Sequence, residues 1–279
     1  MRKIFLPALL TVAALLTVQS LSAQFFIKPR VGYALSVAGE VRGLEVNGST
    51  FTNVYGTTGE GFNAGLGLGY MFNQNIGIEA DFIYFNSSDE VINNTPNLEQ
   101  TRYSRQLRVA PAIVVTASGE GVVPYARFGV LIPVSGTTYD DVITTDEPGS
   151  FEVQTPVGPV TLPGTTDATA ELETRGEITV GFVSNLGISY GISEKAALFT
   201  ELELTTLSIR GRETEVVSYN GTATIQTPLG AVEEDIELSD LPEDRRLREY
   251  DDDSNDPDLL RPVSNFNSLG INIGVRFSF

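Results

Sequence analysis

The sequence predicts an all-β protein: an eight-stranded antiparallel transmembrane β-barrel with long extracellular loops, formed after removal of a signal peptide. Three observations lead to this prediction. Eight segments alternate apolar residues with small or polar ones, the connections between them alternate between short and long, and the last segment stops on an aromatic residue. Because successive side chains of a strand point to opposite faces, each segment would have one apolar and one polar face.

The clearest of these segments covers the last twelve residues, 268–279. Arg276 is the only charged residue in its polar row, and the apolar row consists of Leu269, Ile271, Ile273, Val275, Phe277 and Phe279. A soluble antiparallel sheet would show the same alternation. A strand that stops on an apolar aromatic nevertheless suits a bilayer interface, where aromatic girdles are typical. We therefore expect the apolar row to face lipid.

The first 23 residues have the features of a secretory signal peptide. Arg2 and Lys3 precede an apolar stretch, and small residues lead up to Ala23. We expect cleavage after Ala23, which leaves one barrel domain, residues 24–279. No later segment reaches the ~18 continuous apolar residues of a transmembrane helix.

Composition argues against several classes of function. The 36 acidic and 18 basic residues give a net charge of −18, whereas a nucleic-acid-binding protein needs a basic surface. The chain has no Cys and no His, which removes Cys nucleophiles, Ser–His catalysis and the commonest transition-metal ligands. We therefore expect no enzymatic activity, no cofactor and no nucleic-acid partner.

The eight segments and their connections follow a regular order. The segments cover about residues 25–38, 61–72, 76–84, 103–115, 124–135, 177–190, 198–204 and 268–279. Short connections follow the second, fourth and sixth, and long ones follow the first, third, fifth and seventh, at about 39–60, 86–101, 136–174 and 211–263. An even-stranded barrel with short periplasmic turns and long outer loops has this alternation, and a Greek-key sandwich does not.

The polar rows predict a lumen filled with charged side chains. The run Gly65-x-Gly67-x-Gly69 keeps a period of two and precedes no helix, so we interpret it as small lumen residues rather than a nucleotide loop. An interior of eight strands is only wide enough for its own side chains, so we expect the inward charges to pair as a structural network. The alternative is that they line a narrow path for water or ions. These charged residues are Lys28, Arg30, Glu79, Asp81, Arg108, Arg127, Glu177, Glu201, Glu203 and Arg276.

Two of the long loops share an eight-residue motif. Residues 153–160 read VQTPVGPV, and residues 225–232 read IQTPLGAV. A proline, an apolar residue and a glycine in this order predict a tight turn, as do Asn47-Gly48 and Asn220-Gly221. We therefore expect the barrel strands to continue outward as β-hairpins. The motif is either turn chemistry used twice or part of a protruding sheet whose edge binds a protein by strand addition.

The last long loop contains an acidic run, DDDSNDPD, at residues 251–258. Asp251, Asp253 and Asn255 stand at alternating positions, which resembles a calcium loop. Asp256 stands where that loop requires Gly, however, and Pro262 stands where it requires Glu. We expect a solvated acidic run or diffuse divalent-ion binding rather than a specific metal site.

With these features the mature chain resembles the small outer-membrane β-barrels of the OmpA/OmpX type, often called porin-like. The resemblance implies a location in the bacterial outer membrane, contact with outer-membrane lipid, and assembly by the barrel-insertion machinery through the C-terminal strand. It implies neither a reaction nor a ligand. Two functions stay open: a non-enzymatic barrel that supports the envelope or presents β-rich acidic loops to a protein partner, and a narrow porin-like channel for small solutes or ions.

Overall fold

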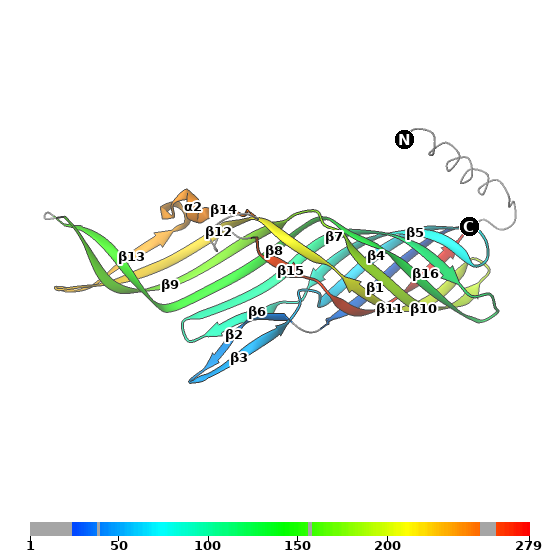
Figure 1. Ribbon diagram of the computed structural model, residues 1–279, viewed down its shortest axis with the longest axis horizontal. Helices are drawn as coiled ribbons and strands as arrows, with labels where there is room; N and C mark the ends of the chain where they lie inside the picture. Colours follow the sequence, from blue (N-terminus) through cyan, green and yellow to red (C-terminus); the bar gives the residue numbers. More distant parts are fainter. Residues whose placement is uncertain (1–23, 38–39, 156–157, 252–260) are drawn as a thin grey trace, which may run out of the picture.

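The chain folds into a closed antiparallel barrel that continues at one end into an open sheet (Figure 1). The computed structural model describes residues 24–37, 40–155, 158–251 and 261–279. Strand β16 pairs with β1, and β7 pairs with β8, so the ring of eight strands closes as predicted. The barrel strands are β1 (Gln24–Ser36), β4 (Gly61–Met71), β5 (Ile76–Ser87), β7 (Leu98–Thr116), β8 (Val122–Thr155), β10 (Gly181–Ser193), β11 (Ala196–Thr206) and β16 (Ser268–Ser278).

The outer surface of the barrel is apolar because the period-two pattern places one row of each strand outside. On β16, Ile271 is 58% exposed, whereas the neighbouring Asn272 is completely buried in the lumen. Leu269, Ile273, Phe277 and Phe279 are exposed on the same outer row, and Val275 is half-buried there. Phe279 also contacts the ring of Phe25 at a centroid distance of 6.4 Å, at the end where the chain finishes.

The short and long connections lie at opposite ends of the barrel, as the sequence predicts. Turns at 72–75, 117–121 and 194–195 join β4 to β5, β7 to β8 and β10 to β11. The C-terminus lies at this same end (Figure 1). The short helices η1 (Leu238–Asp240) and α2 (Glu243–Arg246) belong to the opposite side, and no helix of the described residues could span a membrane.

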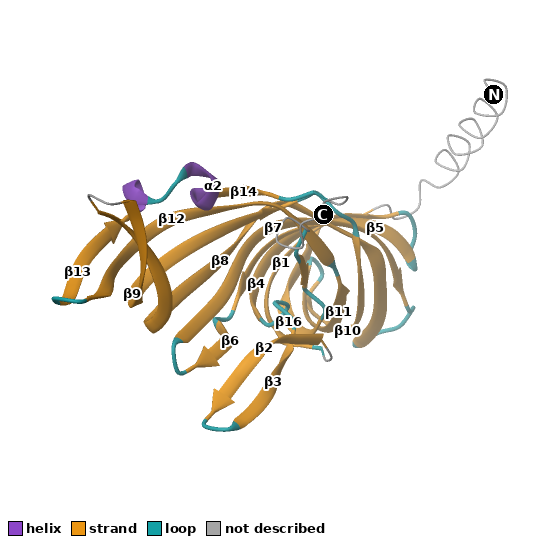
Figure 2. Cartoon of the chain, turned by 60° about the vertical axis from the view of Figure 1, so that its left-hand side comes forward, coloured by secondary structure: helices purple, strands orange, loops and turns teal. Residues whose placement is uncertain are grey.

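Beyond the barrel the strands continue outward as an ordered sheet, so the expectation of β-hairpins is confirmed. Strand β8 has 34 residues and pairs with β9 (Gly158–Gly176) over most of its outer half. The outer sheet has the order β13-β12-β9-β8-β7-β6-β2-β3, and Figure 2 shows it as a curved layer beside the barrel. Its other strands are β12 (Ser208–Thr227), β13 (Gly230–Glu237), β6 (Glu90–Thr95), β2 (Glu40–Asn47) and β3 (Thr50–Gly56), and the short β14 (Leu247–Glu249) and β15 (Val263–Asn265) pair with β12.

Several predicted boundaries differ from the structure. The segment 136–174, assigned from the sequence to a long connection, is mostly strand, as the expected hairpin requires, because β8 and β9 hydrogen-bond to each other beyond the barrel. Strand β10 begins at Gly181 rather than at residue 177, and β1 ends at Ser36. Ala38, like residues 1–23 of the expected signal peptide, lies outside the described residues.

The turn predictions are partly right. Asn47-Gly48 does form the β2–β3 turn, with a positive φ of 62° at Gly48. The turn predicted at Asn220-Gly221 is wrong, because Gly221 lies inside β12, where an added Cβ would stand 2.9 Å from the Cβ of Ala168. The two shared motifs do end their hairpins alike, with φ of 120° at Gly158 and 126° at Gly230, although residues 156–157 lie outside the described residues.

Candidate functional sites in the lumen and the outer sheet

A layer of charged side chains fills the middle of the barrel lumen. Alternate positions of four strands supply it, since β1, β5, β8 and β11 each turn one polar row inward. All of its members are at least nine-tenths buried. The cations are Lys28, Arg30 and Arg127, and the carboxylates are Glu79, Asp81, Glu201 and Glu203.

Arg127 occupies the centre of this charged layer. Its Nη1 lies 2.5 Å from Glu79 and 2.8 Å from Asp81, and its Nη2 lies 3.5 Å from Glu201 and 3.4 Å from Glu203. One guanidinium therefore contacts all four carboxylates of the layer. A buried charge is costly unless it is paired and hydrogen-bonded, and Arg127 meets both conditions.

Lys28 and Arg30 complete the pairing from β1. Lys28 Nζ lies 2.9 Å from Glu201 and 3.6 Å from Glu79. Arg30 donates to Asp81 at 2.8 Å and lies 3.1 Å from Glu203. Neutral groups add further hydrogen bonds. The Tyr125 hydroxyl donates to Glu201, and the amides of Asn63, Asn185 and Asn272 bond to members of the layer.

The glycine run on β4 provides the space that this layer needs. An added Cβ at Gly67 would stand 2.8 Å from Glu79 Oε1, and one at Gly65 would stand 3.1 Å from Arg30 Nε. At Gly69 the added atom would stand 2.0 Å from the Phe26 ring. The interpretation of this run as small lumen residues is confirmed.

Two of the predicted lumen cations have no carboxylate partner within the described part of the chain. Arg108 stacks on Phe85 at 3.9 Å and donates to Gln106 at 2.8 Å. Arg276 stacks on Phe26 at 4.1 Å, nearer the short-turn end. The expected pairing of all inward charges is therefore wrong for these two arginines, because aromatic rings and an amide occupy the positions around them.

Glu177 does not belong to the lumen, which corrects its predicted place. It precedes β10 at the barrel rim, where its backbone N–H donates to Arg210 O and its carboxylate accepts from Arg261. The physical reason is that the chain must cross from β9 to β10 there, so residues 177–180 are not in strand. The inward row of β10 begins only with Gly181 and Val183.

An apolar plug closes the lumen on the long-loop side of the charged layer. It consists of Ile83, Phe85, Ala110, Leu131, Val183, Leu207 and Phe266. Phe266 enters from the connection before β16, and that connection is held where Thr57 Oγ1 donates to Asn267 O at 2.6 Å. The sequence pattern placed Ile83 and Phe266 in polar rows, so periodicity alone did not reveal this plug.

Little space is left inside the barrel. The void between the charged layer and Phe26 measures about 20 Å³, enough for one water molecule. The charged layer and the plug together therefore fill the lumen with side chains.

The outer sheet carries acidic side chains on the face that continues the lipid-facing surface of the barrel. On β7, Thr101 lies on the same face as the lipid-facing Leu107, because side chains of a strand alternate with a period of two. The register sets Thr101 beside Asp141 and Asp141 beside Glu171 on this face. It also sets Glu173 beside Glu215. Arg175 lies at the base of this face, 3.4 to 3.8 Å from Glu173, Glu213 and Glu215. We call this surface the acidic face, defined by Asp141, Asp167, Glu171, Glu173, Glu213, Glu215, Glu233, Asp235 and Glu237.

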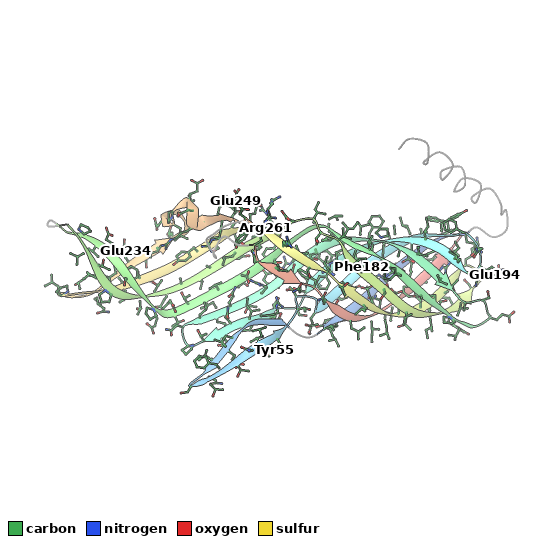
Figure 3. All side chains as sticks on the ribbon, in the orientation of Figure 1. Tyr55, Phe182, Glu194, Glu234, Glu249 and Arg261 are labelled. Atoms are coloured by element: carbon green, nitrogen blue, oxygen red, sulfur yellow. The ribbon has the colours of Figure 1, made fainter. Side chains whose placement is uncertain are left out.

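Strand β13 forms one edge of this sheet. Within the described residues it pairs only with β12. Its residues 230–235 are all exposed, and Glu234 lies toward the end of the sheet farthest from the barrel (Figure 3). The acidic run that follows leaves the described residues after Asp251, so its predicted lack of a specific calcium site stays a prediction.

A partly buried ion pair attaches the β2–β3 hairpin to the sheet. Arg42 on β2 donates to Glu90 on β6 and, at 2.6 Å, to Thr58. Burial raises the pKa of Glu90 above its ordinary value of 4.5, although Arg42 opposes this shift, and burial lowers the pKa of Arg42. Desolvation therefore outweighs the attraction between the two charges.

These features define an outer-membrane β-barrel protein: a closed, apolar-walled barrel with short turns at one end and a large sheet at the other. Residues 8–226 match the family model of the outer membrane protein beta-barrel domain, and the chain belongs to this family. The protein therefore resides in the bacterial outer membrane, surrounded by its lipid.

Several solved structures are similar to this chain. Neisserial surface protein A is 10% identical, with 91% of this chain and 97% of that chain covered, at a TM-score of 0.38. OprG from Pseudomonas aeruginosa is 13% identical, with 92% and 96% covered, at a TM-score of 0.41. Ail, the attachment invasion locus protein of Yersinia pestis, is 8% identical, with 92% and 100% covered, at a TM-score of 0.32. No curated protein matches the chain.

Proposed function

We propose that this protein is a non-enzymatic barrel that displays its outer sheet as a binding surface for another protein. The observation that carries the proposal is the continuity of the strands. Strands β7 and β8 form part of the filled barrel and then continue beyond it as the centre of an ordered sheet. A rigid barrel of this kind would hold the sheet at a fixed height and orientation above the membrane.

The filled lumen supports an anchoring role for the barrel rather than transport. A solute would have to displace both the Arg127 ion pairs and the apolar plug around Phe266. Breaking a buried ion pair costs about 3–5 kcal/mol, so we do not favour the narrow channel.

The β13 edge supports strand addition as the mode of binding. An added strand would place its side chains beside Glu233, Asp235 and Glu237, which share one face. Opposite charges in such cross-strand pairs attract and like charges repel. The edge therefore favours a partner with a basic, extended segment, and it disfavours pairing with a second copy of β13.

The absence of an enzymatic role is part of the same proposal. The 279 residues contain neither His nor Cys, so Ser–His and Cys-based nucleophilic catalysis have no side chains to use. The buried carboxylates are already engaged, with Arg127 contacting all four.

A peptide-binding experiment tests the display function. The protein in lipid nanodiscs is immobilised and exposed to a peptide of alternating Lys and Thr, with an alternating Glu and Thr peptide as the control. We expect saturable binding of the basic peptide alone, weakened by salt because exposed charges are screened.

Two variants separate edge pairing from simple charge attraction. Ala231→Pro removes a backbone donor from β13 and leaves the charge of the edge unchanged, and Glu45→Gln removes a carboxylate from the other wing of the sheet. The proposal predicts lost binding for the first and unchanged binding for the second. Equal binding by all three proteins would contradict it.

We also propose that the signal peptide is removed after Ala23 and that the insertion machinery recognises β16. The outward row of β16, from Leu269 to Phe279, supports this role, because most of its apolar side chains are exposed on the outside of the barrel. Phe279→Ser should lower the fraction of protein recovered in the outer membrane, whereas Leu229→Ser at a fully exposed outer turn should not.

A further inference from the structure

A polar cup opens at the short-turn end of the lumen, away from the outer sheet. It has a volume of about 680 Å³ and lies between the three short turns and the adjoining strand ends. Figure 3 labels Glu194 at this end of the molecule. In an outer-membrane barrel this end faces the periplasm.

The innermost ionisable side chain of this cup is Arg276. It lines both the cup and the small void beneath the charged layer, so it separates the two spaces. Its guanidinium stacks on Phe26 at 4.1 Å, and Phe26 is only 1% exposed. The Nε atom is buried and has no acceptor among the described residues.

The lining of the cup has a small excess of positive side chains, unlike the protein as a whole. In the part of the chain that the structure describes, the lining contains two cations, Arg276 and Lys195, and one carboxylate side chain, that of Glu194, whereas the whole chain carries −18. The lining also offers hydroxyl groups from Ser189 and Ser278. A small anion entering the cup would meet cationic and hydroxyl donors together.

A second lumen arginine, Arg108, stacks on an aromatic ring as Arg276 does but differs from it in its other surroundings. It too lies on an aromatic ring without a carboxylate partner among the described residues, and its Nη2 is buried without an acceptor, but its Nε donates to Gln106 and it is 5% exposed beneath the plug. Arg276 has no such amide and borders an open, polar space. A partly desolvated cation that forms no salt bridge among the described residues is unfavourable, and a bound anion would offset that cost.

We propose that the cup binds a small oxyanion, a carboxylate or a phosphate, with Arg276 as its anchor and Lys195 at its rim. The planar guanidinium suits both groups because each presents two oxygens to its paired N–H donors. The ligand would enter from the periplasm, either as a free ion or as an anionic group of a larger envelope component. This site is independent of the outer sheet and of its partner.

Nuclear magnetic resonance of the arginine side chains tests the proposal directly. The protein in nanodiscs is labelled with ¹⁵N, and the Nε–H signals of Arg276 and Arg108 are assigned from Arg276→Lys and Arg108→Lys. Inorganic phosphate, acetate and chloride are then titrated at constant ionic strength. We expect phosphate or acetate to shift the Arg276 signal saturably while the Arg108 signal stays in place.

Calorimetry of the same samples provides the second measurement. Arg276→Gln should abolish the heat of binding, whereas Arg108→Gln should retain it, and both proteins must keep the gel mobility of a folded barrel. Saturation by the free ions would identify a general oxyanion site, and saturation by acetate alone would restrict it to carboxylates. An equal response to chloride, a parallel shift of Arg108, or retained heat in Arg276→Gln would overturn the proposal.

Discussion

Lys28 on β1 and Glu201 on β11 form an ion pair of 2.9 Å, although 173 residues separate them in the sequence. Strands β1 and β11 lie on either side of β16 and both pair with it. The pair therefore joins the two neighbours of the last strand, and it can form only when β16 has brought them together. The charged layer of the lumen thus depends on closure of the ring.

Removal of Arg127 should destabilise the barrel more than removal of any other lumen cation. Arg127→Met leaves Glu79, Asp81, Glu201 and Glu203 with only Lys28 and Arg30 as cations, and breaking such buried pairs costs about 3–5 kcal/mol. Urea unfolding in phospholipid vesicles measures this loss in the free energy of unfolding. Arg108→Met is the control, because it deletes a buried arginine of the same lumen that has no carboxylate partner among the described residues. Equal losses for both variants would refute the central role of Arg127.

A single methyl group at Gly69 should disturb the barrel. The added Cβ would stand 2.0 Å from the Phe26 ring, so Phe26 must leave its site and take its contact with Arg276 with it. Overpacking of this kind costs about 1–3 kcal/mol. Gly119→Ala is the matched control, since nothing lies within 4 Å of an added Cβ there. A shift of the unfolding midpoint should appear for Gly69→Ala alone.

The sequence predicted the barrel well because its signal is repeated in every strand. One face of each strand must contact lipid and the other must line the lumen. The period of two therefore determines which charged residues point inward, among them Lys28, Glu79 and Arg127. The glycines of β4 could be predicted for the same reason: only small residues fit opposite such large side chains.

The plug and the unpaired arginines could not be predicted in this way. Phe266 reaches the lumen from a connection, and its position depends on tertiary hydrogen bonds of Asn267 with Thr57 and Leu207. Periodicity also cannot say which inward charges meet, because pairing depends on strand register around the ring. Glu177 was misplaced because a strand end has no sharp signal in the alternation.

The attachment of the β2–β3 hairpin should weaken as the pH rises. The pKa of Glu90 is raised in the folded protein by burial, so folding favours its protonated form. The contribution of this group to stability is therefore fully present below its ordinary pKa of 4.5, and it is lost as the pH rises through the raised value. Amide hydrogen exchange of β2 and β3, corrected for the intrinsic pH effect, should show greater protection on the acid side. Glu90→Gln should remove this dependence, and its persistence in that variant would assign it to another group.

The purified barrel should form no steady channels in a planar bilayer. Two layers fill its lumen, and each is made of different side chains: the apolar plug around Phe266 and the ion pairs around Arg127. Phe266→Ala opens only the plug, so we expect this variant to stay silent as well. Because the ion-paired layer is held from β1, β5, β8 and β11 at once, it does not depend on the connection that carries Phe266. Steady conductance of the unmodified protein, changed in selectivity by Glu203→Gln, would instead make transport the function and the charged layer its filter.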